Sequence, residues 1–348
     1  MNATASSTIR RTRQLGAELR VAKVVRQTDD TVSLSFDVPR ELADEFAYKA
    51  GQFLTIRVPA GDTGYARSYS LSSAPGVDDL LTITIKRAIG GRASGWLVDN
   101  AQSGMTFRVL PPSGLFTVSD NARDLLLIAA GSGITPVFSI LKAALLSGSG
   151  RVTVVTSHRT PDDAIFTSEL AELQAAHPGR LTLIDRYTAT DGRLTAQEIA
   201  RLTEGVHWQD AFICGPETFM AAARSALRVD PGRRVHLEEF TSLEGDPFEL
   251  GEVVTDTATA MPAEVHLDGK THEIDWPPES TLVDVLLSRG VRVPYSCREG
   301  DCGSCMSKLT RGRVEMACTD ALEEEDIDDG YILACQARPL EGPLRVDF

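Results

Sequence analysis

The chain lacks the long apolar segments that mark membrane-spanning and exported proteins. Its longest purely apolar run, Leu125–Ala130, has six residues, whereas a membrane-spanning helix needs about 20. Arg10, Arg11 and Arg13 precede no apolar stretch, so the N-terminus does not resemble a secretory signal peptide. We therefore expect a cytoplasmic protein whose few cysteines stay reduced instead of forming disulfides.

Basic residues are scarce in the last third of the chain. Residues 244–348 hold 9 Lys and Arg against 23 Asp and Glu, which accounts for the whole net charge of −14, while residues 1–243 hold 26 of each. This negative field repels nucleic acid and suits docking on a basic protein surface. The alternative is a merely solvated acidic face, such as Glu323–Asp326. We expect no nucleic-acid partner and a monomeric chain.

The composition, with 42% hydrophobic residues, is typical of a globular protein, and 348 residues predict two or three domains. Residues 1–16 are predicted to form a disordered N-terminal segment. Between residues 17 and 119, short β-branched or alternating segments are separated by Gly, Pro and Asp, which predicts a closed or nearly closed antiparallel β-barrel. The expected strands are Arg20–Arg26, Thr31–Val38, Phe53–Val58, Arg67–Leu71, Leu80–Arg87 and Thr106–Leu110.

Residues 120–243 alternate strand and helix patterns, which predicts an α/β domain with a parallel sheet and helices on both faces. The expected strands are Leu125–Ala130, Val152–Thr156, Leu181–Asp185 and Asp210–Cys214. The expected helices run from residue 134 to Leu146 and over Phe166–Ala176, Ala196–Leu202 and Glu217–Leu227.

The remaining residues predict a linker followed by a small α+β domain. Residues 244–262 show no hydrophobic period and contain no Lys or Arg, so we expect a linker. Residues 263–348 predict a mixed sheet around one helix. Its expected elements are a hairpin of Glu264–Leu267 and Thr271–Asp275, a helix capped by Ser280 or Thr281, and a closing strand, Leu344–Val346.

Four cysteines in this last domain have the spacing of an iron–sulfur site. Cys297, Cys302 and Cys305 form C-x4-C-x2-C, and Cys335 follows thirty residues later, which is the plant-type arrangement for a 2Fe–2S cluster. Gly300 and Gly303 permit the tight turns that such a loop needs.

Zinc is the alternative metal for these cysteines. Structural zinc sites usually use two C-x2-C pairs, and only one is present here. A zinc-holding, cysteine-rich binding protein without flavin is therefore the alternative from a different functional class. Cys318 has no partner at ligand spacing, and we expect a packed or partly exposed thiol.

Two segments of the first domain suit a flavin. In R-S-Y-S-L-S-S at 67–73, Arg67 and Tyr69 share one side of a strand and Ser70 lies on the other. A guanidinium suits a pyrophosphate, an aromatic ring stacks on a flavin, and a hydroxyl can reach its redox-active edge. G-G-R-A-S at 90–94 precedes a helix pattern, and Ser94 there adds a hydroxyl to a helix N-terminus that suits phosphate.

The second domain carries signals for a nicotinamide dinucleotide. G-S-G-I-T-P at 131–136 follows a buried strand and opens a helix, which suits a pyrophosphate, although Pro136 replaces the last glycine of G-x-G-x-x-G. Cys214-Gly215-Pro216 ends a strand where ligands of parallel sheets bind, so Cys214 either faces the nicotinamide or is structural. The second strand has no acidic residue at its end that could bind a ribose 2′-hydroxyl. Arg159, which follows this strand, either accepts a 2′-phosphate or is simply exposed. NADH and NADPH both stay open.

Together these motifs resemble a known family. R-S-Y-S-L-S-S, G-S-G-I-T-P and C-G-P resemble the ferredoxin–NADP⁺ reductase superfamily, and the C-terminal block resembles a plant-type ferredoxin with a β-grasp fold. Their order is similar to that in reductase components of oxygenases, in particular the reductases of 3-ketosteroid 9α-hydroxylase and phenylacetyl-CoA epoxidase. The resemblance implies an NAD(P)H-dependent oxidoreductase that passes electrons from NAD(P)H to FAD, to the cluster and to a separate Rieske or diiron oxygenase, such as one that hydroxylates steroids or aromatic compounds. A fatty-acyl desaturase or another diiron acceptor is the alternative partner.

The resemblance also implies roles for single residues. Arg67 and Ser94 would contact the flavin phosphates, Tyr69 would stack on the isoalloxazine, and Ser70 would lie near its N5 atom. Glu238 and Phe240 of L-E-E-F would approach the other flavin face. The residues implied for the two dinucleotides also include Ser68, Gly91, Arg92, Ala93, Gly131, Gly133, Thr135, Pro136, Arg159, Cys214, Gly215 and Pro216, of which Cys214 would lie beside the nicotinamide.

Overall fold

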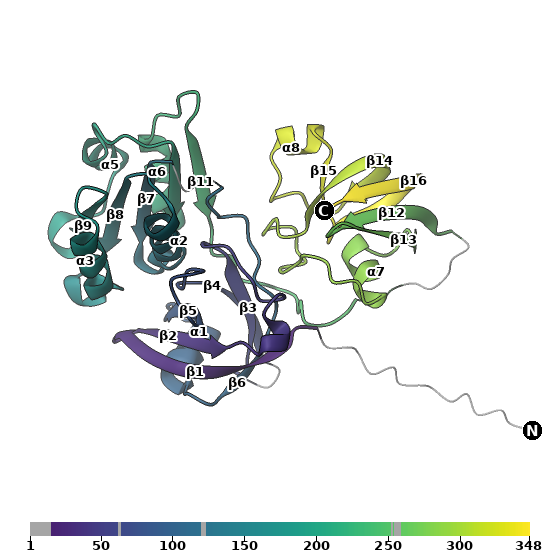
Figure 1. Cartoon of the computed structure of the whole chain (residues 1–348), viewed down its shortest axis with the longest axis horizontal. Helices are drawn as coiled ribbons and strands as arrows, with labels where there is room; N and C mark the ends of the chain where they lie inside the picture. Colours follow the sequence, from purple (N-terminus) through teal and green to yellow (C-terminus); the bar gives the residue numbers. More distant parts are fainter. Residues whose placement is uncertain (1–14, 62–63, 120–122, 252, 254–258) are drawn as a thin grey trace, which may run out of the picture. The chain divides into compact units, whose positions relative to one another are not determined.

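The computed structural model describes residues 15–61, 64–119, 123–251, 253 and 259–348 and divides the chain into two compact units (Figure 1). The larger unit is Ala17–Leu243, and the smaller comprises Glu244–Phe348 together with Leu15 and Gly16. The segment predicted to be disordered, residues 1–16, lies outside the described residues except for Leu15 and Gly16. No helix among the described residues is long and apolar enough to cross a membrane.

The first half of the larger unit is a six-stranded antiparallel sheet in the order β4-β3-β6-β1-β2-β5. An isolated bridge between Leu71 and Ile83 links the two edges, so the sheet is nearly closed, as the sequence predicts. Its interior is filled by apolar side chains such as Phe36, Leu54 and Ile83, which are all fully buried. The elements are β1 (Ala17–Thr28), β2 (Thr31–Asp37), β3 (Phe53–Val58), β4 (Tyr65–Ser70), β5 (Leu81–Lys86), α1 (Arg92–Asn100) and β6 (Thr106–Val109).

The second half is a five-stranded parallel sheet in the order β11-β10-β7-β8-β9. One face packs on α2 and α3 and the other on α5 and α6, because alternate strand residues feed two separate apolar clusters. The strands are β7 (Leu125–Ala130), β8 (Val152–His158), β9 (Leu181–Tyr187), β10 (Asp210–Cys214) and β11 (Arg234–Glu238). The helices are α2 (Ile134–Ser147), α3 (Thr167–Ala176), α4 (Thr188–Asp191), α5 (Ala196–Leu202) and α6 (Glu217–Ala226).

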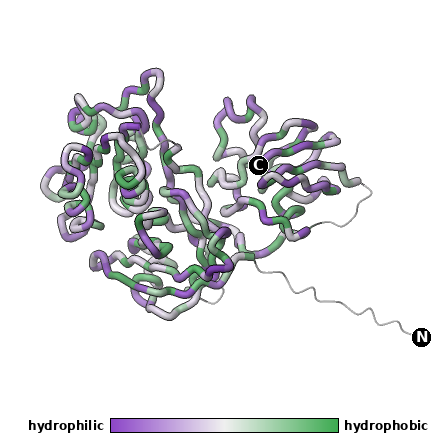
Figure 2. Tube along the Cα trace, in the orientation of Figure 1, coloured by the Kyte–Doolittle hydropathy of each residue, from purple (hydrophilic) through white to green (hydrophobic). Residues whose placement is uncertain are grey.

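The smaller unit is a mixed five-stranded sheet in the order β13-β12-β16-β14-β15 packed on helix α7. Thr281 caps this helix, since its hydroxyl accepts a hydrogen bond from the Asp284 amide (3.3 Å). The elements are β12 (Met261–Leu267), β13 (Lys270–Trp276), α7 (Leu282–Ser288), β14 (Met306–Met316), α8 (Glu324–Asp328), β15 (Tyr331–Leu333) and β16 (Ala337–Asp347). Figure 2 shows that hydrophilic residues are frequent along β14 and β16.

Some of the described residues of 244–262, the segment expected to be a linker, contact the rest of the smaller unit. Strand β12 begins at Met261, and Phe248 is fully buried within the smaller unit. The Glu249 carbonyl accepts a hydrogen bond from Arg298, and the Phe248 carbonyl accepts one from the Leu15 amide (2.9 Å). The described residues 244–251 therefore form part of the C-terminal unit, because one aromatic side chain and several backbone groups hold them there.

Candidate functional site

The first cavity of the larger unit has a volume of about 590 Å³ and lies against strand β4. Its walls come from β4, from the loop between β5 and α1, from the start of α2, and from residues 240–242. Predicted flavin-site residues line it: Arg67, Ser68, Tyr69, Ser70, Gly91, Arg92, Ala93, Ser94 and Phe240, together with Thr135. Sequence reasoning missed several further lining residues: Tyr65, Thr84, Lys86, Ala88, Ile89, Gly90, Ser132, Thr241 and Ser242.

The polar side chains of this cavity are held in place by neighbours. The Arg67 guanidinium donates to the Leu243 carbonyl (3.1 Å) and lies over the Tyr65 ring, 5.3 Å from its centroid. Arg92 donates to the Tyr65 hydroxyl (2.8 Å). Two cationic groups are thus fixed on the same wall, one on β4 and one at the first residue of α1, where unsatisfied helix amides add positive potential. This wall suits the phosphates of a dinucleotide.

Ser94 also stabilises the turn that precedes α1. Its hydroxyl accepts a hydrogen bond from the Ala88 amide (3.1 Å). A Cβ atom on Gly91 would lie 2.5 Å from this hydroxyl oxygen. Glycine is therefore required at position 91 because the turn closes tightly on Ser94.

Three groups named from the motifs come together at the ends of β10 and β11. Glu238 pairs with Cys214 in the parallel register, and the Ser70 hydroxyl donates to the Glu238 carboxylate (3.4 Å). Burial raises the pKa of Glu238 to about 8, although the hydrogen bond from Ser70 acts in the opposite direction. Burial also raises the pKa of the Cys214 thiol well above its usual value, and the Glu238 charge adds to this.

Cys214 ends strand β10 in the interior of the fold. The thiol is fully buried in the apolar cluster beneath α2 and lines neither of the two cavities described here. Tyr69, by contrast, lines the first cavity, and its burial raises its pKa although Arg67 lowers it, so the phenol stays neutral.

A second cavity of about 620 Å³ is next to the first. Lys86 and Ile89 line both cavities, and the turn after β7 separates them: Gly131 faces the second cavity, whereas Ser132 and Thr135 face the first. Of the predicted nucleotide residues, Arg159 and Pro216 also line the second cavity. Residues that the motifs did not indicate include Arg87, His158, Arg193 and Phe219.

The glycines of this turn have separate structural reasons. Gly131 has φ +56°, and a Cβ atom there would meet nothing within 4 Å, so the backbone itself faces the cavity. A Cβ atom on Gly133 would lie 2.1 Å from the Cys214 carbonyl oxygen. Gly215 is similarly confined, with Phe219 at 2.8 Å from such a Cβ atom. Helix α2, with Pro136 in its first turn, therefore starts in direct contact with β10.

The end of β8 carries one buried and one exposed basic side chain. His158 is 5% exposed. Burial lowers its pKa, although the Asp185 charge acts in the opposite direction, so the imidazole is neutral. Its Nδ1 atom has no hydrogen-bond partner among the described residues. The Arg159 side chain is 81% exposed and lies 3.6 Å from Asp163.

The smaller unit brings the four motif cysteines together. The thiols of Cys302 and Cys335 hydrogen-bond to Cys297, which lowers the pKa of Cys297, and Cys305 in turn contacts Cys335. Backbone amides point at these sulfurs: Glu299 donates to Cys297 and Cys335 donates to Cys305, each at 3.4 Å. Four convergent sulfurs with amide donors fit a 2Fe–2S cluster.

The cluster loop depends on residues that the motif did not reveal. Arg298 has φ +62°, a left-handed conformation that is uncommon for a non-glycine residue. Its guanidinium forms an ion pair with Asp284 of α7 and donates to the Glu249 carbonyl. Gly300 has φ +96°, and a Cβ atom there would lie 2.7 Å from the Cys318 sulfur, so Cys318 packs against the loop, partly exposed.

Comparison with known proteins agrees with this three-part arrangement. Residues 18–118 match the family model of an oxidoreductase FAD-binding domain, residues 127–225 that of an oxidoreductase NAD-binding domain, and residues 265–340 that of a 2Fe–2S iron–sulfur cluster binding domain. These matches remove the alternative of a zinc-holding protein without flavin.

Known relatives match the chain over nearly its whole length. The chain is 47% identical to a 3-ketosteroid-9-alpha-monooxygenase ferredoxin reductase component of Rhodococcus rhodochrous, over 95% of this chain and 96% of the relative. It is 31% identical to one of the subunits of the 1,2-phenylacetyl-CoA epoxidase of Escherichia coli, over 95% and 97%. The structure of phthalate dioxygenase reductase aligns with a TM-score of 0.55 at 25% identity, over 96% and 98% of the two chains. The chain therefore belongs to the family of oxygenase reductase components that combine FAD-binding, NAD-binding and 2Fe–2S domains.

Proposed function

We propose that this chain takes electrons from NAD(P)H and delivers them to a separate oxygenase component, with a steroid-hydroxylating oxygenase as the first candidate partner. The observation that carries the proposal is the pair of cavities that meet at the turn after β7, in a chain that also holds four convergent thiols. The steroid assignment follows the printed function of the relative that is 47% identical. The protein would act as a cytoplasmic monomer.

The first cavity would hold FAD. Tyr69 presents a neutral aromatic ring for stacking, while Arg67 and Arg92 face the phosphates together with the amides at the start of α1. Phe240, whose side chain is 52% exposed, would cover part of the ligand. Ser68, Gly91, Ala93 and Ser94 would shape the remaining wall.

The second cavity would hold the nicotinamide dinucleotide. Gly131 would let the pyrophosphate approach the backbone, and Gly133 lets α2 begin close to β10, so that its amides point toward the ligand. Thr135 donates to the Ser132 carbonyl (2.9 Å) and thereby fixes the turn. Pro136, Arg159, Cys214, Gly215 and Pro216 are proposed as further residues of this site.

When bound, FAD accepts two electrons as a hydride and the cluster carries one electron at a time. Ser70 and Glu238 would control protons beside the redox centre. Because the pKa of Glu238 is about 8, its carboxyl is mostly protonated at neutral pH and can donate a hydrogen bond. The high pKa of Cys214 keeps its thiol neutral, so no thiolate opposes a negative charge that develops nearby.

Cys302→Ser tests the order of electron flow, because Cys302 is a predicted cluster ligand on the partly exposed side of the loop. We expect the variant to lose iron and acid-labile sulfide and to keep NAD(P)H-dependent ferricyanide reduction. Reduction of cytochrome c or of the oxygenase should be lost, since only the cluster passes electrons outward. Cys318→Ser is the matched control and should keep both activities. Equal loss of both activities in the Cys302 variant would contradict the proposal.

A further inference from the structure

Helix α2 carries a polar stripe on an otherwise apolar surface. Thr135, Ser139 and Lys142 follow one another at intervals of four and three residues, which places them on one face, and Ser132 lies three residues before Thr135 in the turn that leads into the helix. Nearly all residues from Ile134 to Leu145 are buried, Lys142 included. These four residues are called the α2 stripe below. Ser139 and Lys142 are covered by protein, whereas Ser132 and Thr135 border the first cavity.

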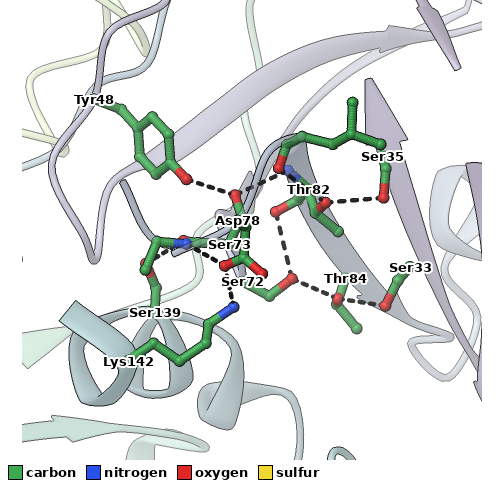
Figure 3. Close-up of polar contacts among 12 residues, drawn as sticks. Ser33, Ser35, Tyr48, Ser72, Ser73, Asp78, Thr82, Thr84, Ser139 and Lys142 are labelled. Carbon is green, nitrogen blue, oxygen red and sulfur yellow. Dashed lines mark hydrogen bonds and ion pairs between the residues drawn. The ribbon is translucent and has the colours of Figure 1, made fainter. Parts of the chain in front are cut away.

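The part of the larger unit before residue 120, called the flavin half below, covers Ser139 and Lys142 of the stripe. The part from residue 123 to Leu243 is called the nucleotide half. The Ser139 hydroxyl donates to the Ser73 carbonyl and accepts a hydrogen bond from the Gly51 amide (3.3 Å). A Cβ atom on Gly51 would lie 1.9 Å from the Phe116 carbonyl oxygen and 3.0 Å from the Ile140 side chain, so the helix and this loop touch. Figure 3 shows Ser139 and Lys142 pointing from the helix toward the loop that carries Ser73 and Asp78.

Lys142 contributes an ion pair to the stripe. Its ammonium forms an ion pair with Asp78, and the two side chains are only 10% and 35% exposed. The same Asp78 carboxylate accepts a hydrogen bond from the Ala74 amide (2.8 Å), so it also stabilises the turn in which it lies. Burial lowers the pKa of Lys142, and Asp78 opposes this effect. The ammonium also lies 4.6 Å from the centre of the Phe138 ring.

Buried hydroxyls continue this contact into the flavin-cavity wall. The Ser73 hydroxyl accepts hydrogen bonds from Tyr48 (2.8 Å) and from the Thr82 amide (2.9 Å). The next serine, Ser72, hydrogen-bonds to Thr84 (2.8 Å), and Thr84 lines the cavity (Figure 3). The loop that contacts Ser139 and Lys142 is therefore anchored to strand β5 beside the first cavity.

We propose that the α2 stripe positions the two cavities relative to each other, with Lys142 and Asp78 as positioning residues for hydride transfer. Ser132 and Thr135, at one end of the stripe, form the wall between the cavities, and Ser139 and Lys142, at the other end, fix the helix on the flavin half. A shift of the helix moves the nucleotide turn relative to β4. This inference rests on the proposed use of the two cavities by NAD(P)H and FAD.

The test compares Lys142→Met and Asp78→Asn with Arg180→Met in the full-length holoprotein. Arg180 donates to the carbonyls of Ala144, Leu145 and Gly148 at the end of α2 and is not in contact with the flavin half through any of its hydrogen bonds. Its loss should therefore destabilise the same helix without releasing the stripe. Three quantities are measured: the melting temperature, the change in flavin absorbance on adding NAD(P)⁺, and the limiting rate of anaerobic flavin reduction by NAD(P)H.

We expect Lys142→Met and Asp78→Asn to lower the limiting rate roughly tenfold, because small displacements of reacting groups have large effects on rate. The flavin absorbance response to NAD(P)⁺ should change as well. The double variant should resemble the single variants, since both remove one interaction. Arg180→Met should lower the melting temperature and keep the limiting rate within about twofold.

The inference would be overturned if Lys142→Met and Arg180→Met had similar melting temperatures and also the same limiting rate and absorbance response. If Lys142→Met does not fold, Ser139→Ala replaces it, with a smaller loss of rate expected and an unchanged rate counting against the inference. A wild-type protein without NAD(P)H-dependent flavin reduction would instead contradict the proposed function, so the two failures are distinguishable.

Discussion

The contact of Gly133 with strand β10 gives a quantitative prediction for Gly133→Ala. Gly133 has φ −61° and ψ −12°, which alanine adopts readily, so considerations of backbone entropy alone predict that the variant is more stable by about 0.4–1 kcal/mol. The structure predicts the opposite. The new Cβ atom would lie 2.1 Å from the Cys214 carbonyl oxygen and 2.8 Å from the Gly215 nitrogen. Both neighbours are backbone atoms, so the start of α2 must move away from β10.

Overpacking of this kind typically costs about 1–3 kcal/mol, and a contact with rigid backbone falls at the upper end. For a unit of this size, about 3 kcal/mol corresponds to a melting temperature roughly 6–12 °C lower. Because the same turn faces the second cavity, affinity for NAD(P)H should fall as well.

Thermal unfolding of the holoprotein and titration with NAD(P)⁺ measure both effects. Gly95→Ala is the matched control: Gly95 lies within α1, and its added Cβ atom would meet only the end of the Arg87 side chain, at 3.2 Å. That variant should be unchanged or more stable by up to about 1 kcal/mol. If Gly133→Ala is as stable as Gly95→Ala, the reasoning from this contact is refuted.

Three further predictions concern a raised pKa, a lowered pKa and flavin binding. The pKa of Glu238 rises from 4.5 to about 8 on folding. The stability of the wild type relative to Glu238→Gln should therefore be greatest below pH 4.5 and should decline as the pH rises to about 8. Parallel pH profiles of the two melting temperatures would contradict this. Burial alone would raise the pKa of Asp210, but Arg234, Arg123 and His236 hold it below its usual value of 3.8, so Asp210→Asn should cost about 2–3 kcal/mol in denaturant unfolding at pH 7. This difference should shrink as the pH falls below 3.8, and a constant difference would count against the ion pairs. Tyr69→Ala should purify with its iron but depleted of flavin, and full flavin occupancy would refute its stacking role.

Elements with a strong apolar pattern were predictable from the sequence, whereas edge strands and polar strands were not. Leu125–Ala130 forms β7 at the residues expected, since all six of its side chains are buried in the middle of a sheet. Strand β11 was missed because it is an edge strand in which Arg234 and His236 interrupt the apolar residues. Strand β14 was missed because its residues are mostly polar and its register with β16 shifts repeatedly between Leu309 and Val314.

The motifs identified one side of each cavity, and the fold provides the other. Tyr65, Thr84 and Ser242 line the same cavity from three distant segments, and nothing in their local sequence indicates it. The raised pKa of Glu238 results from burial between chain segments, so it could not be read from L-E-E-F itself. Arg298 was not noticed because a positive φ at a residue with a side chain has no simple sequence pattern.

The α2 stripe shows why spacing alone cannot tell a solvent face from a polar interface. In the sequence, Ser139 and Lys142 have the spacing of residues that keep one side of a helix in water. Burial of an unpaired ammonium costs several kcal/mol, and the ion pair with Asp78, from a loop between β4 and β5, offsets part of this cost for α2. The nucleotide half therefore depends on the flavin half for the stability of its central helix. This dependence gives a physical reason why residues 17–243 form one compact unit, although the sequence divides them into a β-barrel pattern and an α/β pattern.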